Sequence, residues 1–514
     1  MPTSGGSTTI DSFGPHQLAV ALLVGSLVLL VSVAAVRLAN RSGLPTLLLY
    51  LAIGVAIGEA GLGIRFDDPT LTQVLGYTAL VLILTEGGLT TRWSTIKSSV
   101  APAALLSTLG VVVSISVVGV ASHVLLDLSW QISFLLGAIV SSTDAAAVFS
   151  VLRNVPLPHR LTGVLEAESG FNDAPVVLIV IALAEAATPG QTSGAWWTVV
   201  LTAVFELAGG AVIGLLLGWG LGRLIRRAGV GSSGLFSIGI VAICVLSYAG
   251  ATLAHTSGFI ACYLTALVLG NLHLPHRQAV LGFGQALGWL AQIGLFVLLG
   301  LLASPSRLEA QLVPALVIGL VLLLLARPAS IVASMSWFGF RWREQVFLSW
   351  AGLRGAVPVV LATVPLTLGT PRTEWIFDLV FVLVVVFTLL QAPTLPALAR
   401  RLGLIEDTQA LDMQVESTPL EDLHAEMLQV RVGPLSRLHG VELHELRLPP
   451  GANVTMVVRE GASFVPDRRT VLRRSDQLLL VTTAATRSAT IRRVRAVSQG
   501  GRLADWRARG SGTP

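Results

Sequence analysis

The chain has 514 residues, of which 53% are hydrophobic and only 12% are charged, and its formal net charge is +5. Soluble domains carry roughly 25% charged residues, so most of this chain cannot be a soluble domain. The composition excludes a secreted protein, a soluble enzyme and a nucleic-acid-binding protein, and it leaves membrane lipid as the main surroundings.

The charged residues are unevenly placed along the chain. Residues 1–400 hold 34 of them, or 8.5%, whereas residues 401–514 hold 29, or 25%. We therefore expect a transmembrane domain followed by a small soluble domain. The predicted division is an extracellular tail at 1–15, a transmembrane domain at 16–400, a linker at 401–414, a cytoplasmic domain at 415–495 and a disordered tail at 496–514.

The first part divides into thirteen apolar segments. Each has about the 20 residues that an α-helix needs to cross a bilayer. The predicted spans are 16–38, 44–59, 71–90, 100–126, 131–152, 161–187, 197–226, 235–254, 257–272, 279–303, 311–333, 343–368 and 374–400.

The links between these spans alternate in basic charge. Fourteen Lys or Arg residues fall on one set of links and only three, Arg65, Arg307 and Arg372, on the other. Basic links stay in the cytoplasm. The bias therefore predicts an N-terminus outside the cell, a cytoplasmic C-terminal domain, and an odd number of spans in a multi-pass protein of the bacterial inner membrane.

Several charged residues fall inside the predicted spans. A charge within the bilayer is unfavourable by about 3 kcal/mol or more and marks a functional site by default. For Glu206 and Asp378, toward span ends, an interfacial position is the simpler interpretation. Glu166 suits the start of its helix or a cation-attracting vestibule. The full set is Glu86, Asp144, Glu166, Glu168, Asp173, Glu206, Arg354 and Asp378.

Two of the spans contain residues that interrupt a helix. Asp144 follows three hydroxyl residues in SSTDAAAVF, residues 141–149, and such side chains compete for backbone hydrogen bonds. Arg354 lies in GLRGAVP, residues 352–358, between two glycines and before a proline. One interrupted helix in each half of a long apolar chain is typical of secondary transporters with inverted repeats.

The stretch EAESGFNDAP, residues 166–175, places Ser169, Asn172 and Asp173 on one helix face, since they are three and four residues apart. Glu168 faces another neighbour. Hard monovalent cations prefer oxygen ligands, so Asp173, Asp144, Ser169 and carbonyls near Thr143 form a candidate cation site. A carboxylate that holds either a proton or a cation, but not both, is an exchange site.

Five motifs in order resemble one family, the monovalent cation:proton antiporter family 1 of bacterial sodium/proton and potassium/proton exchangers. The resemblance covers roughly residues 15–400. It is carried by LTEGGL (84–89), SSTDAAAVF, EAESGFNDAP, SGFIACYLTALVLGN (257–271) and WAGLRGAVPVVLA (350–362).

The resemblance implies an all-α polytopic membrane protein with about thirteen helices, inverted repeats, two crossed and interrupted helices, and a homodimer. It places Thr143 and Asp144 at the crossing, and it makes Asp173 the ion carrier beside Asn172. Ser169 matches a cation-contacting serine.

The same resemblance assigns the remaining charges. It implies a structural ion pair between Glu168 and Arg354, with Glu86 and Glu166 as accessory acids. An Asn at 172 resembles the electroneutral branch. This chain departs from the family by lacking a proline after Asp144.

Residues 415–495 resemble the C-terminal ligand-binding subdomain of potassium-transport regulators (RCK_C or TrkA_C). Val454–Val458 and Gln477–Thr483 are predicted strands, and Leu438–Leu446 is a predicted short helix, so this domain is α/β. The resemblance suggests a nucleotide-type regulatory ligand, such as a cyclic dinucleotide, and a dimerising module without a ligand is the alternative. Basic residues that suit an anion are Arg468, Arg469, Arg473 and Arg474.

The most consistent function is antiport of a monovalent cation for protons, with no cofactor and no enzymatic activity. The attached regulatory domain favours K⁺ over Na⁺, and a Na⁺(Li⁺)/H⁺ antiporter is the alternative. A regulated cation channel would need a carbonyl filter or a charged ring, and the sequence shows no repeated filter motif.

Overall fold

The computed structural model describes residues 14–504 apart from 43–44, 60, 62, 64–67, 153–154, 156, 190–195, 228–231, 273, 406–414, 421–424, 434–435 and 484. Most of the predicted tail 1–15, most of the linker 401–414 and the end of the tail 496–514 lie outside the described residues. The chain forms a helical part, within residues up to 404, and a small sheet-containing part after it.

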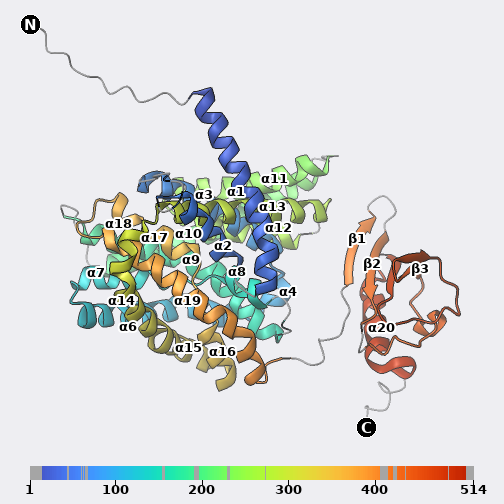
Figure 1. Cartoon of the computed structure of the whole chain (residues 1–514). Coiled ribbons are helices and arrows are strands. Elements are labelled where there is room, and N and C mark those ends of the chain that lie inside the picture. The colour runs from blue at the N-terminus through green and yellow to red at the C-terminus, as the bar shows by residue number, and fades with distance from the viewer. Residues whose placement is uncertain are drawn as a thin grey trace, which may run out of the picture. The chain divides into compact units, whose positions relative to one another are not determined.

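The helical part is built from apolar helices that follow one another with short links (Figure 1). The helices of its first half are α1 (Pro15–Ser42), α2 (Thr46–Ile57), α3 (Pro69–Thr90), α4 (Trp93–Ile96), α5 (Val100–Leu105), α6 (Val111–Leu126), α7 (Trp130–Ile139), α8 (Ala145–Leu152) and α9 (His159–Ala187). Those of its second half are α10 (Trp196–Arg227), α11 (Ser233–Leu253), α12 (Gly258–Asn271), α13 (Arg277–Leu302), α14 (Pro305–Val321), α15 (Arg327–Met335), α16 (Trp342–Trp350), α17 (Ala356–Leu361), α18 (Val364–Thr367) and α19 (Glu374–Arg401).

Each predicted span corresponds to a helix or a broken helix. Within the described residues, nine helices are long and apolar enough to cross a membrane, and four shorter apolar helices lie at 46–57, 130–139, 258–271 and 356–367. Two of these four belong to the spans expected to be interrupted. The fold is therefore the expected polytopic helical one, and the count of thirteen crossings stays a prediction.

Two stretches of the helical part repeat the same order of elements. In each, a helix with a π-helical turn is followed by a broken helix and then by a long helix. The π-helical turns are Leu106–Gly110, between α5 and α6, and Leu322–Ala326, between α14 and α15. The broken helices are α7–α8 and α16–α18, and the long ones are α9 and α19. This correspondence supports the expected internal repeat.

The helices pack as two groups. The repeat group contains α5–α9 and α14–α19, which pack mainly on one another, for example α5 and α7 on α9 and α14 on α19. The scaffold group contains α1–α3 and α10–α13, where α12 packs on α3, α10 and α11 and α2 crosses α13 closely at Gly54. The functional site lies where these groups meet.

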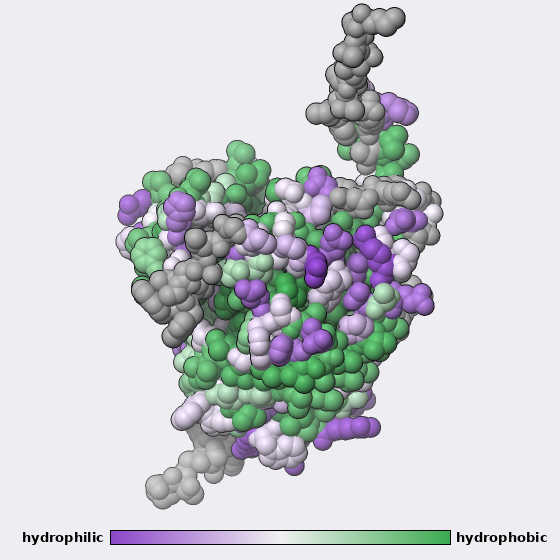
Figure 2. All heavy atoms as spheres, turned by 90° about the vertical axis from the view of Figure 1, so that its left-hand side faces the viewer, coloured by the Kyte–Doolittle hydropathy of each residue, from purple (hydrophilic) through white to green (hydrophobic). Residues whose placement is uncertain are grey.

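Much of the helical surface is apolar. Leu, Val, Phe and Trp side chains on α1 and α10 are more than half exposed, among them Leu23, Leu30, Phe205, Leu216 and Trp219. On the face drawn in Figure 2, hydrophobic residues form a broad continuous band. Monomeric soluble proteins rarely expose such large apolar areas, so this surface fits the hydrocarbon of a bilayer.

The C-terminal part is a five-stranded antiparallel sheet in the order β1-β2-β5-β3-β4. Its strands are β1 (Val415–Leu420), β2 (Ala425–Arg431), β3 (Ala452–Arg459), β4 (Ala462–Phe464) and β5 (Gln477–Thr483). Gln477–Thr483 is the predicted strand, and Val454–Val458 lies within β3. Leu438–Leu446, in contrast, is mostly turns with a single 3₁₀ turn at Leu443–Leu446, so the helix predicted there is wrong.

The final helix, α20 (Arg487–Gly500), covers this sheet and runs past the predicted boundary at residue 495. Val494 and Val497 are buried in the core of the sheet part. Ser498 hydrogen-bonds Ser436 at 2.7 Å between the hydroxyl oxygens. The expected start of the disordered tail at 496 is therefore too early, because the apolar face of α20 continues for another turn.

Candidate ion-exchange site

The two broken helices meet at their breaks. The first break covers residues 140–144, between α7 and α8, and the second covers 351–355, between α16 and α17. The backbone N–H of Asp144 donates to the carbonyl oxygen of Leu353 at 2.9 Å. A methyl group at Gly355 would collide with the carboxylate of Asp144. The glycine therefore allows the acid of one break to lie against the backbone of the other.

A cavity of about 270 Å³ opens beside this crossing. Both helix groups line it, since α2, α3, α12 and α13 contribute from the scaffold group and α9, α17 and the first break from the repeat group. The expected site residues Thr143, Asp144, Ser169 and Asp173 line the cavity together, and so do the accessory acids Glu86 and Glu166. Residues that lie between 4 and 87 positions from Asp173 in the sequence thus converge on one space.

Asp173 is the most enclosed carboxylate of this cavity. Its exposed fraction is 8%, and Ser142 donates its hydroxyl to Asp173 Oδ1 at 2.8 Å. Ser142 was not among the predicted site residues, although it belongs to the hydroxyl run before Asp144. Asp144 and Ser169 line the same cavity as the second carboxylate oxygen of Asp173. Together they provide several oxygen atoms, the ligands that a hard monovalent cation prefers.

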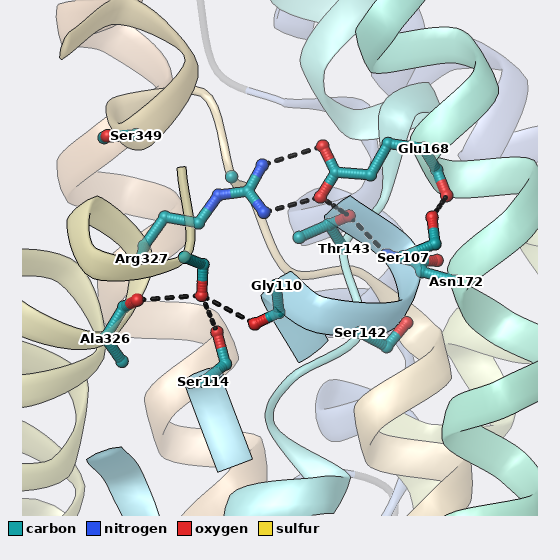
Figure 3. Close-up of polar contacts among 12 residues, drawn as sticks. Ser107, Gly110, Ser114, Ser142, Thr143, Glu168, Asn172, Ala326, Arg327 and Ser349 are labelled. Carbon is teal, nitrogen blue, oxygen red and sulfur yellow. Dashed lines mark hydrogen bonds and ion pairs between the residues drawn. The ribbon is translucent and has the colours of Figure 1, made fainter. Parts of the chain in front are cut away.

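Glu168 points away from the cavity, as expected, but its partner is not the predicted one. Arg327 donates Nη1 to Glu168 Oε1 at 2.5 Å and Nη2 to Oε2 at 2.8 Å (Figure 3). Both side chains are buried. The predicted Glu168–Arg354 ion pair is therefore wrong, because Arg327 reaches the carboxylate with the two-pronged geometry that arginine prefers.

Arg354 instead hydrogen-bonds the backbone at the two breaks. Its Nε donates to the carbonyl oxygen of Val140 at 2.9 Å, and its Nη1 donates to that of Gly352 at 2.8 Å. These carbonyls lie where α7 and α16 end and lack helical partners. A positive charge is favourable at a helix C-terminus, so Arg354 stabilises both interrupted ends at once.

Asn172 lies on the Glu168 side of α9 and not on the cavity. Its Nδ2 donates to Thr143 Oγ1 at 2.6 Å, and Thr143 Oγ1 donates to Glu168 Oε1 at 3.1 Å. The expectation that Asn172 faces the same way as Ser169 and Asp173 is therefore wrong. Asn172 connects the break to the ion pair, and it holds α9 in register with the crossing.

The first π-helical turn lies behind the ion pair and contacts the second repeat. Ser107, in the first turn, donates to the backbone carbonyl of Glu168 at 3.3 Å, and Ser330 donates to the carbonyl of Gly110 at 2.7 Å. Ser330 also hydrogen-bonds Ser114 at 2.7 Å between the hydroxyl oxygens. The turn belongs to the first repeat and Ser330, in α15, to the second, so the repeats meet here as well as at their breaks.

Arg327 is the main functional residue that sequence reasoning missed. It lies well inside the predicted span 311–333 and precedes Pro328. A charge at that depth was a sufficient reason to include it with Arg354.

Two further acids differ in their surroundings. Asp378 is 5% exposed and pairs with Arg307, whose Nε lies 3.3 Å from Asp378 Oδ2. The interfacial interpretation of Asp378 stays a prediction, since the residue lies near the start of α19 and its partner Arg307 is exposed. Glu206 is partly exposed on α10, which fits an interfacial position.

In the C-terminal part, Arg468 lines a wide groove with His444, Arg447 and Asn453, and Arg469, Arg473 and Arg474 are exposed elsewhere on this part. The buried carboxylate of Asp476 receives two bonds from Arg459, at 2.8 and 2.9 Å. Asp476 raises the pKa of Arg459 through these bonds.

The fold and the site together define a membrane transporter with a carboxylate at a crossing of broken helices. Residues 27–401 match the sodium/hydrogen exchanger transmembrane family, and residues 427–494 match the TrkA-C domain. The chain belongs to the sodium/hydrogen exchanger family, which is a family of cation/proton antiporters, and it carries a TrkA-C domain.

Similar proteins include two named potassium/proton antiporters. The chain is 36% identical over 471 residues to the K(+)/H(+) antiporter NhaP of Alkalimonas amylolytica, covering 90% of this chain and 80% of that protein. It is 34% identical over 464 residues to the K(+)/H(+) antiporter NhaP2 of Shewanella baltica, covering 89% and 80%. The Na(+)/H(+) antiporter NhaS2 of Synechocystis is 28% identical over 404 residues, covering 76% and 72%.

A solved structure shows the same fold. The sodium proton antiporter MjNhaP1 from Methanocaldococcus jannaschii at pH 8 superposes with a TM-score of 0.66 over 75% of this chain and 99% of that one, at 23% sequence identity.

Proposed function

We propose that this antiporter exchanges K⁺ for H⁺ electroneutrally, with Asp173 as the shared carrier. The observation that carries the proposal is the position of Asp173, enclosed at the crossing of the two breaks and lining the cavity with Asp144 and Ser169. A single carboxylate binds either one proton or one monovalent cation, so each direction of transport moves one positive charge.

In this proposal the cation is held at Asp173, Asp144, Ser169 and the backbone of Thr143, with Glu86 as an accessory acid across the cavity. All these residues line the cavity. Ser142 holds one oxygen of Asp173 and leaves the other for the cation or the proton. Asn172 orients the break through Thr143 and does not bind the ion directly.

The choice of K⁺ rests on relatives. Two of the similar proteins are named K(+)/H(+) antiporters and match about nine-tenths of this chain, including its C-terminal part. A Na⁺(Li⁺)/H⁺ antiporter is the second candidate, which the Synechocystis relative favours through its name.

Alternating access follows from how the cavity is built. The scaffold group supplies one wall and the repeat group, with Asp173, supplies the other. Movement of the repeat group against the scaffold group would expose Asp173 to one side of the membrane at a time. A continuously open channel would not need a carboxylate that is enclosed at the crossing, so the regulated cation channel is the weaker alternative.

The proposal includes the orientation and the assembly. The charge bias of the links supports a multi-pass protein of the bacterial inner membrane, with residues 1–15 outside and the C-terminal domain in the cytoplasm. The exposed apolar faces of α1 and α10 leave room for a homodimer within the bilayer. We also propose that the C-terminal domain regulates transport, with a nucleotide-type ligand near Arg468 as its candidate effector.

The test is transport by purified protein in liposomes that contain a pH-sensitive dye. K⁺ and Na⁺ are added separately to the wild type and to the Asp173→Asn variant. We expect K⁺-dependent proton movement in the wild type, no exchange in the variant, and no dependence of the final cation ratio on membrane potential. Cation-dependent proton flux through a correctly folded Asp173→Asn variant would contradict the proposal.

A further inference from the structure

The cavity contains a second polar cluster at some distance from Asp173. On α9, Glu166 lies seven residues before Asp173, which is two turns or about 10 Å along the helix axis. Both carboxylates line the cavity. Glu166 is therefore on the same route as the carrier, nearer to the N-terminal end of α9.

Glu166 is held by a residue of the scaffold group. The hydroxyl of Thr91, the residue that follows α3, lies 2.9 Å from Glu166 Oε1 and 2.7 Å from the carbonyl oxygen of Gly87. Asn271, at the end of α12, fixes Thr91 by donating Nδ2 to its backbone carbonyl at 2.9 Å. Glu166, from the repeat group, and Thr91, from the end of the scaffold helix α3, both line the cavity that the two groups share.

The third member of the cluster is Tyr263 of α12. Its exposed fraction is 2%, and its ring lines the cavity. Among the described residues, no group hydrogen-bonds its hydroxyl. A methyl group at Gly170 would collide with this hydroxyl and the end of the ring, which places the hydroxyl against α9 one turn after Glu166. A buried hydroxyl without a partner is unfavourable, and such groups usually have a ligand or water to satisfy them.

We propose that Glu166, Thr91 and Tyr263 form a second binding site for the transported monovalent cation, in series with the site at Asp173. This inference rests on the proposed exchange at Asp173. One carboxylate and two hydroxyls are oxygen ligands of the kind that a hard cation prefers, and the cation would satisfy the lone pairs of the Tyr263 hydroxyl.

The charges around the cluster make this site a weak one. Arg92 is exposed, follows Thr91 directly, and interacts electrostatically with Glu166. Its positive charge opposes binding of a cation at Glu166. A weak site suits a place where ions stop briefly before they reach Asp173, since tight binding there would slow the transport that follows.

The cluster also depends on the arrangement of the two helix groups. Thr91 and Tyr263 belong to the scaffold group and Glu166 to the repeat group. Movement of one group along the other would separate the ligands. The second site is therefore complete in this arrangement of the two groups. When the repeat group moves, the ligands separate and the cation is released.

The test measures exchange rate against K⁺ concentration in everted membrane vesicles, whose outer solution reaches the cytoplasmic side. Glu166→Gln should raise the half-saturating K⁺ concentration roughly tenfold, as expected for the loss of one nearby charge, while the maximal rate stays near that of the wild type. Tyr263→Phe should raise it about threefold, the effect of one neutral hydrogen-bonding group. Arg92→Gln should lower it, because a competing positive charge is removed.

The matched control is Glu185→Gln, which removes an acid from the far end of the same helix, where the side chain is exposed. It should leave the half-saturating concentration unchanged. An equal effect of Glu166→Gln and Glu185→Gln, or a loss of maximal rate alone in Glu166→Gln and Tyr263→Phe, would overturn the second site. Retained exchange in Asp173→Asn would instead overturn the proposed function, so the two failures are distinguishable.

Discussion

Glu168 and Arg327 are 159 residues apart in sequence and share two hydrogen bonds in the interior of the repeat group. Each comes from a different repeat, α9 in the first and α15 in the second. The ion pair lies on the side of α9 that faces away from the cavity. It therefore joins the two repeats without occupying the space that the cation needs.

This pairing makes a first prediction about stability. Arg327→Met should lower the free energy of unfolding by about 3–5 kcal/mol, since it leaves Glu168 as a buried charge without its partner. The double change Arg327→Met with Glu168→Gln should recover a large part of the loss. The measurement is the apparent Tm of each variant in detergent. A double variant no more stable than Arg327→Met alone would contradict the pairing.

Arg354 gives a second prediction, of a different kind. Arg354→Ala should lower both stability and transport, because the carbonyls of Val140 and Gly352 lose a charged donor, at about 1.5–3 kcal/mol for each such bond. Glu168→Gln should not rescue it. In double-mutant cycles, the coupling of Glu168 with Arg327 should exceed that with Arg354. A larger coupling energy between Glu168 and Arg354 would instead support the Glu168–Arg354 ion pair expected from the sequence.

The contrast between these arginines shows what the sequence could and could not predict. The breaks were predictable because their causes are local: the hydroxyl run before Asp144 and the glycines and proline around Arg354 both disfavour a continuous helix. The convergence of Asp144, Ser169 and Asp173 followed from helix spacing and from the resemblance. The partner of Glu168 was not predictable from local sequence, because distant packing decides which of two buried arginines reaches the carboxylate.

The C-terminal part shows the same distinction. Gln477–Thr483 was predictable as a strand because its aliphatic and threonine residues favour one. The edge strand β1, VESTPL, contains a proline and three polar residues, so its own sequence does not favour a strand. It forms because it pairs with β2. The extra turn of α20, residues 496–500, depends on burial of Val497 in the core, because its sequence, AVSQG, holds only one large apolar residue.

A third prediction concerns the glycine at the crossing. Gly355→Ala should abolish or strongly reduce exchange, because a methyl group there displaces the carboxylate of Asp144. The protein should still fold, since the site is a local one. Gly282→Ala is the control, because a methyl group at that position of α13 meets no atom. The measurements are K⁺-dependent proton flux in liposomes and the elution profile in detergent, which reports folding. Normal flux in Gly355→Ala would mean that transport does not require the close contact between the Asp144 carboxylate and the backbone at residue 355.

A fourth prediction concerns the C-terminal domain. Its charge content of 25% and its own buried core indicate a module that folds separately from the transporter. A folded module attached after α19 can couple its shape to the helices. Truncation after Leu404 should therefore leave exchange active but change its dependence on pH or on K⁺ concentration.

The matched variant keeps the full length and disturbs only the module. Asp476 is fully buried and accepts both bonds from Arg459, so Asp476→Ala leaves the arginine without its partner and should loosen the sheet. Its exchange should resemble that of the truncated protein. If both variants keep the pH and K⁺ dependence of the wild type, the domain does not regulate transport. If the truncated protein inserts well and has no flux, the domain belongs to the transport machinery, because a regulator can be removed without loss of the exchange step at Asp173.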